Sequence, residues 1–174
     1  GSLLGDAVAE IMVADAANDM LHLLQFDGVT YMPVSALPCG SGPSQVVATD
    51  LNFDTHLDFV VSNLFSEDLS ILYGLGEKQF SSEVRVPLPG PVARFEVGDF
   101  TNDIIPDIAA TLYDKIGGSR RPAGILCTVQ GNNDGTFKEP AVYGAGWGAL
   151  SFCLADMNGD RSPDICTGDR NRNT

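Results

Sequence analysis

Basic residues are scarce in this chain. Ten lysines and arginines stand against 23 aspartates and glutamates in 174 residues, which gives a formal net charge of −13. Nucleic acids and anionic membranes are bound through basic surfaces, so this charge argues against both as partners. No apolar run approaches the roughly 18–20 residues of a membrane-spanning helix, so we expect no membrane insertion. The first thirty residues also lack the basic start of a secretory signal peptide.

The residue patterns of zinc sites and of common enzymes are absent as well. The four cysteines, Cys39, Cys127, Cys153 and Cys166, show no CxxC spacing, and the two histidines are isolated. No Ser–His–Asp set, phosphate-binding glycine loop or closely spaced glutamate pair stands out. We therefore predict that the chain is not an enzyme.

Helical periodicity is nearly absent. Apolar runs of four to seven residues alternate instead with clusters of Gly, Pro, Asn, Asp and Ser. This pattern predicts an all-β fold. A hydrophobic fraction of 44% is typical of a soluble globular chain rather than a disordered one.

Aspartate, by contrast, is plentiful and regularly spaced. Residues 156–164 carry oxygen-bearing side chains at the first, third, fifth and ninth positions, between two apolar segments. Residues 50–58 and 99–107 show the same spacing, and a weaker copy surrounds Asp6. Several oxygens on a tightly curled loop suit a hard cation such as Ca²⁺. The first aspartates are separated by 49 and 57 residues, and a period near 50 indicates a repeat architecture.

The segments between these acidic loops follow one order. Approximate repeats span 1–49, 50–98 and 99–155, and a further repeat starts at 156–174. Strands are expected after the loops at 11–14, 59–62, 108–111 and 165–167, and a second strand at 21–24, 69–73 and 125–129. A glycine-containing turn, a third strand and a Gly/Pro corner follow, then the strand that enters the next loop. Four strands per repeat are typical of β-propeller blades. The extra residues at 114–124 predict a long exposed loop.

Together these features resemble the FG-GAP/VCBS repeats of integrin-α-type β-propellers. The similarity lies in the acidic loop with its flanking strands, in the turn 130–137 and in the corner Gly40-Ser41-Gly42-Pro43, and it covers essentially the whole chain. The resemblance implies a calcium ion in each loop. The side-chain ligands would be Asp50, Asn52, Asp54 and Asp58; Asp99, Thr101, Asp103 and Asp107; and Asp156, Asn158, Asp160 and Asp164. Position seven would donate its backbone carbonyl, from His56, Ile105 and Ser162.

The loops depart from the family at position six, where Thr55, Ile104 and Arg161 replace glycine. Glycine relaxes a sharp turn, whereas a β-branched residue in a left-handed conformation is strained. Either the loops avoid a positive φ here or their sites are weaker. We rank the loop 156–164 first as a calcium site, 50–58 second and 99–107 third. Without metal, each would be an Asx-rich turn that caps a hairpin.

Three repeats are too few for a closed propeller, which has about 4–8 blades. We therefore expect further blades from the same polypeptide or from another copy, because an open blade exposes unpaired strand edges. Cys153 and Cys166 would lie nearly opposite each other in a hairpin, either as a disulfide or as two small thiols. Trp147 could stack on a sugar or pack between blades.

The leading hypothesis is a non-catalytic, calcium-stabilised propeller segment for adhesion or protein recognition. One alternative is a carbohydrate-binding lectin-type propeller, and another is an accessory domain of a secreted lyase or hydrolase. The partner would be a protein or glycan ligand. We expect the chain to be secreted or at the cell surface, because free calcium in the cytosol is too low for modest sites.

Overall fold

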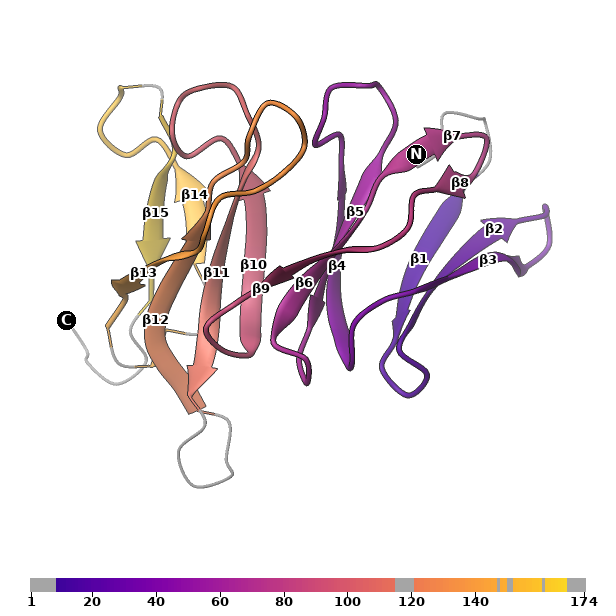
Figure 1. Ribbon diagram of the computed structural model, residues 1–174, viewed down its shortest axis with the longest axis horizontal. Helices are drawn as coiled ribbons and strands as arrows, with labels where there is room; N and C mark the ends of the chain where they lie inside the picture. The colour runs from indigo at the N-terminus through magenta and orange to yellow at the C-terminus, as the bar shows by residue number, and fades with distance from the viewer. Residues whose placement is uncertain (1–8, 115–120, 147, 150–151, 161, 169–174) are drawn as a thin grey trace. The chain divides into compact units, whose positions relative to one another are not determined.

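The computed structural model describes residues 9–114, 121–146, 148–149, 152–160 and 162–168 (Figure 1). Every regular element in these ranges is a β-strand, and the sheets are antiparallel, which confirms the all-β prediction. The chain divides into two compact units, Gly1–Pro87 and Leu88–Thr174. No helix able to cross a membrane occurs in the part of the chain that is described.

The first unit contains two larger sheets and a short hairpin. A three-stranded sheet has the order β1-β2-β3, and a four-stranded sheet has the order β4-β5-β6-β9, with the hairpin β7-β8 inserted between β6 and β9. The bounds are β1 Glu10–Asp15, β2 Met20–Phe26, β3 Tyr31–Pro38, β4 Pro43–Thr49, β5 Asp58–Asn63, β6 Asp68–Leu72, β7 Gly74–Gly76, β8 Gln79–Phe80 and β9 Val84–Pro87.

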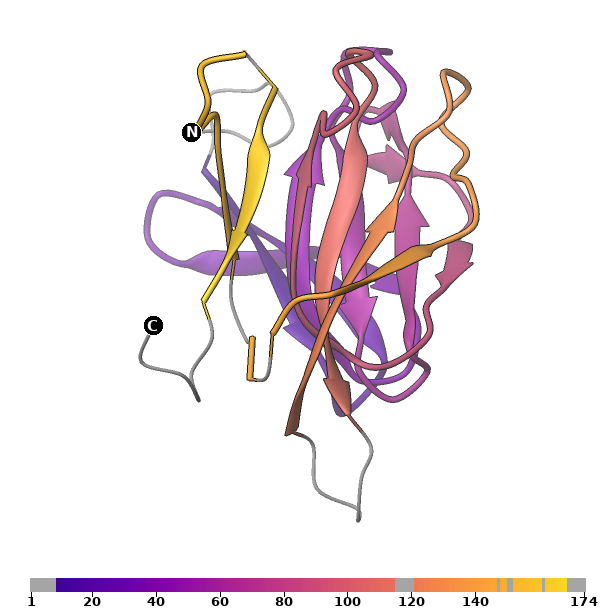
Figure 2. The same cartoon turned by 90° about the vertical axis from the view of Figure 1, so that its left-hand side faces the viewer.

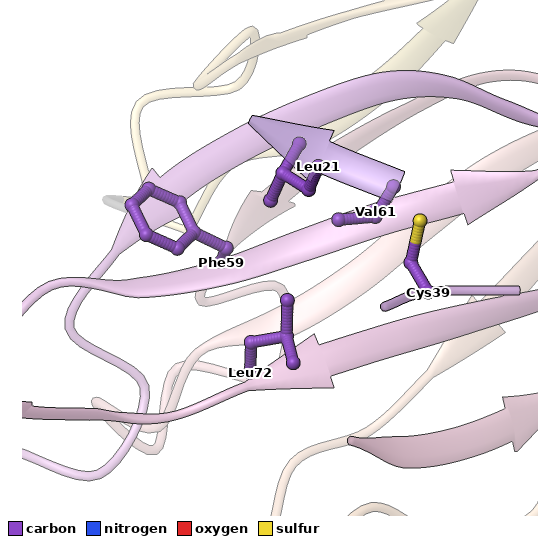
Figure 3. Close-up of a cluster of buried hydrophobic side chains, with 5 residues drawn as sticks. All are labelled: Leu21, Cys39, Phe59, Val61 and Leu72. Carbon is purple, nitrogen blue, oxygen red and sulfur yellow. The ribbon is translucent and has the colours of Figure 1, made fainter. Parts of the chain in front are cut away.

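The core of the first unit lies between these two sheets. Leu21 of β2 and Cys39, just after β3, pack with Phe59 and Val61 of β5 and with Leu72 of β6 (Figure 3). Residues two apart on a strand share a face, so Phe59 and Val61 present one apolar surface to Leu21. Burying each large side chain of this kind contributes about 1.5–3 kcal/mol.

The second unit contains the four-stranded sheet β10-β11-β12-β13 and the two-stranded sheet β14-β15. Their bounds are β10 Val92–Gly98, β11 Asp107–Asp114, β12 Arg121–Val129, β13 Ala141–Gly144, β14 Phe152–Ala155 and β15 Asp164–Thr167. The β14-β15 hairpin, yellow in Figure 2, lies beside the larger sheet, and the Thr167 hydroxyl donates a hydrogen bond to the Ala145 carbonyl at 3.1 Å.

The central strands are buried on both faces. Every residue of β5 and β6 is buried, and so are the first six residues of β11. Strands covered on both sides read as continuous apolar runs rather than alternating ones. This explains why Phe59-Val60-Val61 and Ile108-Ala109-Ala110 show no polar alternation, whereas all four residues of the edge strand β13 are exposed.

The predicted loop 114–124 is wrong on its C-terminal side. Strand β12 already begins at Arg121, which pairs with Asp114, and Pro122 pairs with Tyr113. Proline is tolerated at strand ends and beside bulges, and the register of β11 and β12 shifts between Thr111 and Tyr113. Residues 121–124 therefore extend the strand, while 115–120 lie outside the described residues.

Candidate metal-binding loops

Each acidic segment joins two antiparallel strands. The first loop, residues 50–58, joins β4 to β5; the second loop, 99–107, joins β10 to β11; and the third loop, 156–164, joins β14 to β15. The ninth residue of each loop opens the following strand. Within the second unit, the second and third loops lie at the same end of their sheets (Figure 1).

The aspartates at positions one and five hold the backbone in the same way in all three loops. The first aspartate accepts a hydrogen bond from the amide of the fifth residue, at 3.2 Å in each loop. The fifth aspartate accepts one from the amide of the seventh residue, at 2.8, 2.9 and 2.8 Å. These seventh residues, which are the predicted carbonyl ligands, are His56, Ile105 and Ser162. Their backbone amides donate to the aspartate at position five.

The side chain at position three separates the second loop from the other two. Asn52 and Asn158 each accept the amide of the fifth residue, at 3.1 and 2.8 Å, and donate to its carboxylate at 3.0 and 2.9 Å. Positions one, three and five therefore converge in the first and third loops. Thr101 instead donates its hydroxyl to Asp107, at 3.2 Å. The second loop thus lacks the third converging oxygen.

In the first two loops the ninth aspartate is a buried structural group. Asp58 is fully buried and accepts the amides of Leu51 and Gly74, both at 2.8 Å. Asp107, 1% exposed, likewise accepts the amides of Phe100 and Gly131, at 3.1 and 2.8 Å. In the third loop, which is more exposed, Asp164 accepts the amide of Met157 at 2.9 Å. In the first two loops this carboxylate therefore binds two separate segments. One is the second residue of its own loop, and the other is a glycine shortly after β6 or β12.

Glycine is required where that second segment approaches the loop. A Cβ on Gly74 would lie 2.5 Å from the carbonyl oxygen of Leu57, and one on Gly131 would lie 2.3 Å from that of Pro106. Gly74 opens the β7-β8 hairpin, and Gly131 forms an isolated bridge with Phe137. Only a residue without a Cβ brings its amide to the buried carboxylate.

The loops use left-handed backbone at positions four and six. The φ values are 62° at Phe53 and 73° at Thr55 in the first loop, and 58° at Asn102 and 76° at Ile104 in the second. Gly159, at position four of the third loop, has φ 80°. The alternative that the loops avoid a positive φ is therefore wrong for Thr55 and Ile104. Arg161, the sixth residue of the third loop, lies outside the described residues.

The carboxylates of the first loop influence one another. Burial raises the pKa of Asp58, the amides of Leu51 and Gly74 oppose that rise, and the charges on Asp54 and Asp50 add to it. A cation in the loop would offset this repulsion, because an opposite charge favours the ionised carboxylate.

The donor chemistry fits a hard cation better than a transition metal. Positions one, three and five of the first and third loops bear carboxylate and amide oxygens, which calcium prefers, and no imidazole or thiol. Within the described ranges, no three His, Cys, Asp or Glu side chains form a group arranged to hold a metal. The oxygens contact backbone amides instead, as they do in an Asx-rich turn.

A cavity of about 360 Å³ opens beside the second and third loops, within the second unit. Phe100 and Tyr143 supply aromatic surface, and Thr128, Gln130 and Asp164 supply polar groups. Tyr143 is 53% exposed. The sequence prediction missed this cavity, because its residues come from four strands and two loops. Alternation in β12 was the available signal, since it places Leu126 and Thr128 on one face.

The other residues considered from the sequence are Trp147, the histidines and the cysteines. Trp147 lies outside the described residues. His22 contacts the Asp15 carboxylate through Nε2 at 3.2 Å, which places it beside the turn after β1. Cys39 and Cys127 are buried free thiols in different units, and Cys153 and Cys166 are free thiols as well.

Comparisons with known protein families, with curated proteins and with solved structures find no match for this chain.

Proposed function

We propose that this chain is a non-catalytic, calcium-binding segment of a β-propeller, secreted or at the cell surface, that serves adhesion or protein recognition. One observation carries the proposal: three loops with the same acidic spacing share the hydrogen bonds at positions one, five and seven. A common geometry in three separate hairpins favours a common ligand over three unrelated turns.

Backbone strain in the loops supports the same proposal. A left-handed conformation costs a non-glycine residue about 1–2 kcal/mol. The first and second loops each contain two such residues, at Phe53 and Thr55 and at Asn102 and Ile104. Strain of this kind persists where other interactions hold it, and it is common at ligand sites.

In the first and third loops the ion would be held by the converging side chains at positions one, three and five. These are Asp50, Asn52 and Asp54, and Asp156, Asn158 and Asp160. When bound, calcium would neutralise the loop carboxylates and couple their geometry to folding. In the second loop Thr101 turns toward Asp107, so we expect this loop to bind more weakly.

The strand order supports propeller blades. The sheets β4-β5-β6-β9 and β10-β11-β12-β13 are both four-stranded antiparallel meanders that begin with the strand entering an acidic loop. In each of these sheets the first two strands flank the acidic loop. Strands β14 and β15 flank the third loop and therefore correspond to the first two strands of such a unit, whereas β1-β2-β3 corresponds to the last three. We therefore propose that further strands, from the same polypeptide or another copy, complete these sheets.

Calcium titration by calorimetry tests the metal proposal. We expect two or three binding events and a melting temperature about 5–10 °C higher in saturating calcium than in EDTA, because a ligand that binds only the folded state stabilises it. The variants D54N and D160N should each remove a strong event, since they delete a charge but keep an acceptor.

The matched control is D27N. Asp27 also accepts two backbone amides in an exposed turn, from Val29 at 2.8 Å and Thr30 at 2.9 Å, but it lies outside the loops. This variant should bind calcium like the unmodified chain. If calcium produces neither heat nor a melting shift, or if D27N is as defective as D54N, the calcium proposal is wrong.

The cavity of the second unit favours a second candidate, recognition of a glycan. Sugar rings stack their apolar faces on aromatic side chains, and their hydroxyls bond to polar groups. Phe100 and Tyr143 with Thr128 and Gln130 offer both kinds of contact. Glycan-array binding that is lost in Y143A, but kept when the exposed Tyr31 of β3 is changed in Y31A, would favour this function. An array without binding would leave protein recognition as the proposed function.

A further inference from the structure

Two cysteines face each other across the β14-β15 hairpin, which is yellow in Figures 1 and 2. Cys153 of β14 and Cys166 of β15 are direct Cα partners in the antiparallel register. Both are free thiols, and the Cys166 thiol donates a hydrogen bond to the sulfur of Met157 in the third loop at 2.6 Å. The hairpin that they join contains the whole third loop.

The register suits a covalent bond. Opposite residues in an antiparallel pair have Cα atoms about 4.5–5.5 Å apart, and disulfides span Cα separations of about 4.4–6.8 Å. Both kinds of antiparallel pair fall within that range. A bond between the two sulfurs therefore requires side-chain rotation and little backbone movement.

The hairpins β4-β5 and β10-β11, which carry the first and second loops, have other residues at the same register position. There Val47 pairs with Val60 and Glu96 with Ala109. Val60 and Ala109 also pair with a further strand, at Ile71 and Thr128, so those hairpins have support from both sides. Among the described strands, β15 pairs only with β14. The cysteine pair thus occurs in the hairpin that has the least support from its sheet.

Access distinguishes this pair from the other cysteines. Cys153 is exposed and Cys166 is partly exposed, whereas Cys39 and Cys127 are buried. Burial shields Cys39 and Cys127 from dissolved reagents, and it raises the pKa of both thiols to about 11. A dissolved oxidant meets the hairpin pair first.

We propose that Cys153 and Cys166 are a redox modification site that forms a cross-strand disulfide with a low-molecular-weight disulfide, such as oxidised glutathione, as oxidant. The new bond closes the base of the third loop. It limits the separation of β14 and β15 and stabilises the loop whether or not metal is bound.

The reaction is two successive thiol–disulfide exchanges. The more exposed Cys153, as thiolate, attacks one sulfur of oxidised glutathione, whose S–S bond breaks and releases one glutathione thiolate. The Cys166 thiolate then attacks the Cys153 sulfur, and the mixed disulfide breaks and releases the second glutathione. The two protons from the cysteines pass to the two glutathione thiolates. Two electrons leave the protein, and one protein disulfide and two reduced glutathiones form.

The test uses the full chain in EDTA, equilibrated in glutathione buffers of increasing oxidised fraction and then alkylated. Peptide mass spectrometry should find residues 153 and 166 in one cross-linked peptide that has lost two hydrogen atoms. Cys39 and Cys127 should be alkylated only after unfolding. The oxidised chain should melt at a higher temperature and exchange the amide hydrogens of the third loop more slowly.

The variant C153S/C166S is the control, because serine preserves size and cannot be oxidised. Its melting temperature should be the same in oxidised and reduced buffer. The proposal is overturned if the unmodified chain yields only glutathione adducts, a link between two chains, or free thiols at every redox ratio. It is also overturned if the cross-link forms without slowing exchange in the third loop.

Discussion

Replacing Ile104 by glycine should stabilise the protein. Ile104 lies at position six of the second loop with φ 76°, and its side chain is 79% exposed. The left-handed conformation costs a β-branched residue about 1–2 kcal/mol, which I104G removes. Glycine adds about 0.5–1 kcal/mol of backbone entropy cost. Little apolar burial is lost, so the free energy of unfolding should rise by about 0.5–1 kcal/mol and the melting temperature by about 1–4 °C.

Two neighbouring variants make this test specific. I104A keeps a Cβ and should not gain, because alanine also disfavours a positive φ. I105G changes the next residue, which has an ordinary φ and is only partly exposed, so it should lower stability. Urea unfolding in EDTA measures all three without a contribution from metal. The reasoning is refuted if I104G is no more stable than I104A.

Three further perturbations test the loops and the buried thiols. D58A leaves the buried amides of Leu51 and Gly74 without an acceptor, so urea unfolding should show a loss of about 2–4 kcal/mol, more than for the exposed D54A. G131A places a Cβ 2.3 Å from the Pro106 carbonyl oxygen and should lower the melting temperature, whereas G144A, with nothing within 4 Å, should not. Because the pKa of Cys39 and Cys127 is about 11 in the folded state, above the ordinary value of 9.0, the folded chain retains protons that the unfolded chain releases. Stability should therefore be complete below pH 9 and fall as the pH rises through 11, by about 2–3 kcal/mol for each thiol. A C39A/C127A variant, unfolded by urea across this range, should lack that part of the alkaline loss.

The sequence predicts the fold class and the positions of the strands well, because both depend on local signals. Runs such as Phe59-Val60-Val61, bounded by turn residues, identify strands without knowledge of their partners. The hairpin signal around the third loop was enough to place Cys153 and Cys166 nearly opposite each other, and their register confirms it. The boundary at Arg121 was missed because Pro122 and Gly124 suggest a loop, whereas a bulge accommodates them within a strand.

The candidate site was predictable in its residues but not in their separate roles. Spacing alone treats the four oxygen-bearing positions of a loop as equivalent. The structure separates them, because Asp58 is buried and binds the amide of Gly74, 16 residues away. Such a long-range contact depends on how β6 returns to the loop, and no local pattern encodes it. The cavity beside Tyr143 was missed for the same reason.

The buried ninth aspartate has a consequence for how related sequences change. Asp58 and Asp107 support the backbone of two segments, so selection for folding retains them even in a loop that no longer binds an ion. The first, third and fifth positions are more exposed and bond only within their own loop, so they are less constrained by folding and change more readily once binding is lost. Among related chains, an aspartate at position nine would therefore indicate a shared fold. Only the oxygen-bearing residues at positions one, three and five would indicate that a loop binds an ion.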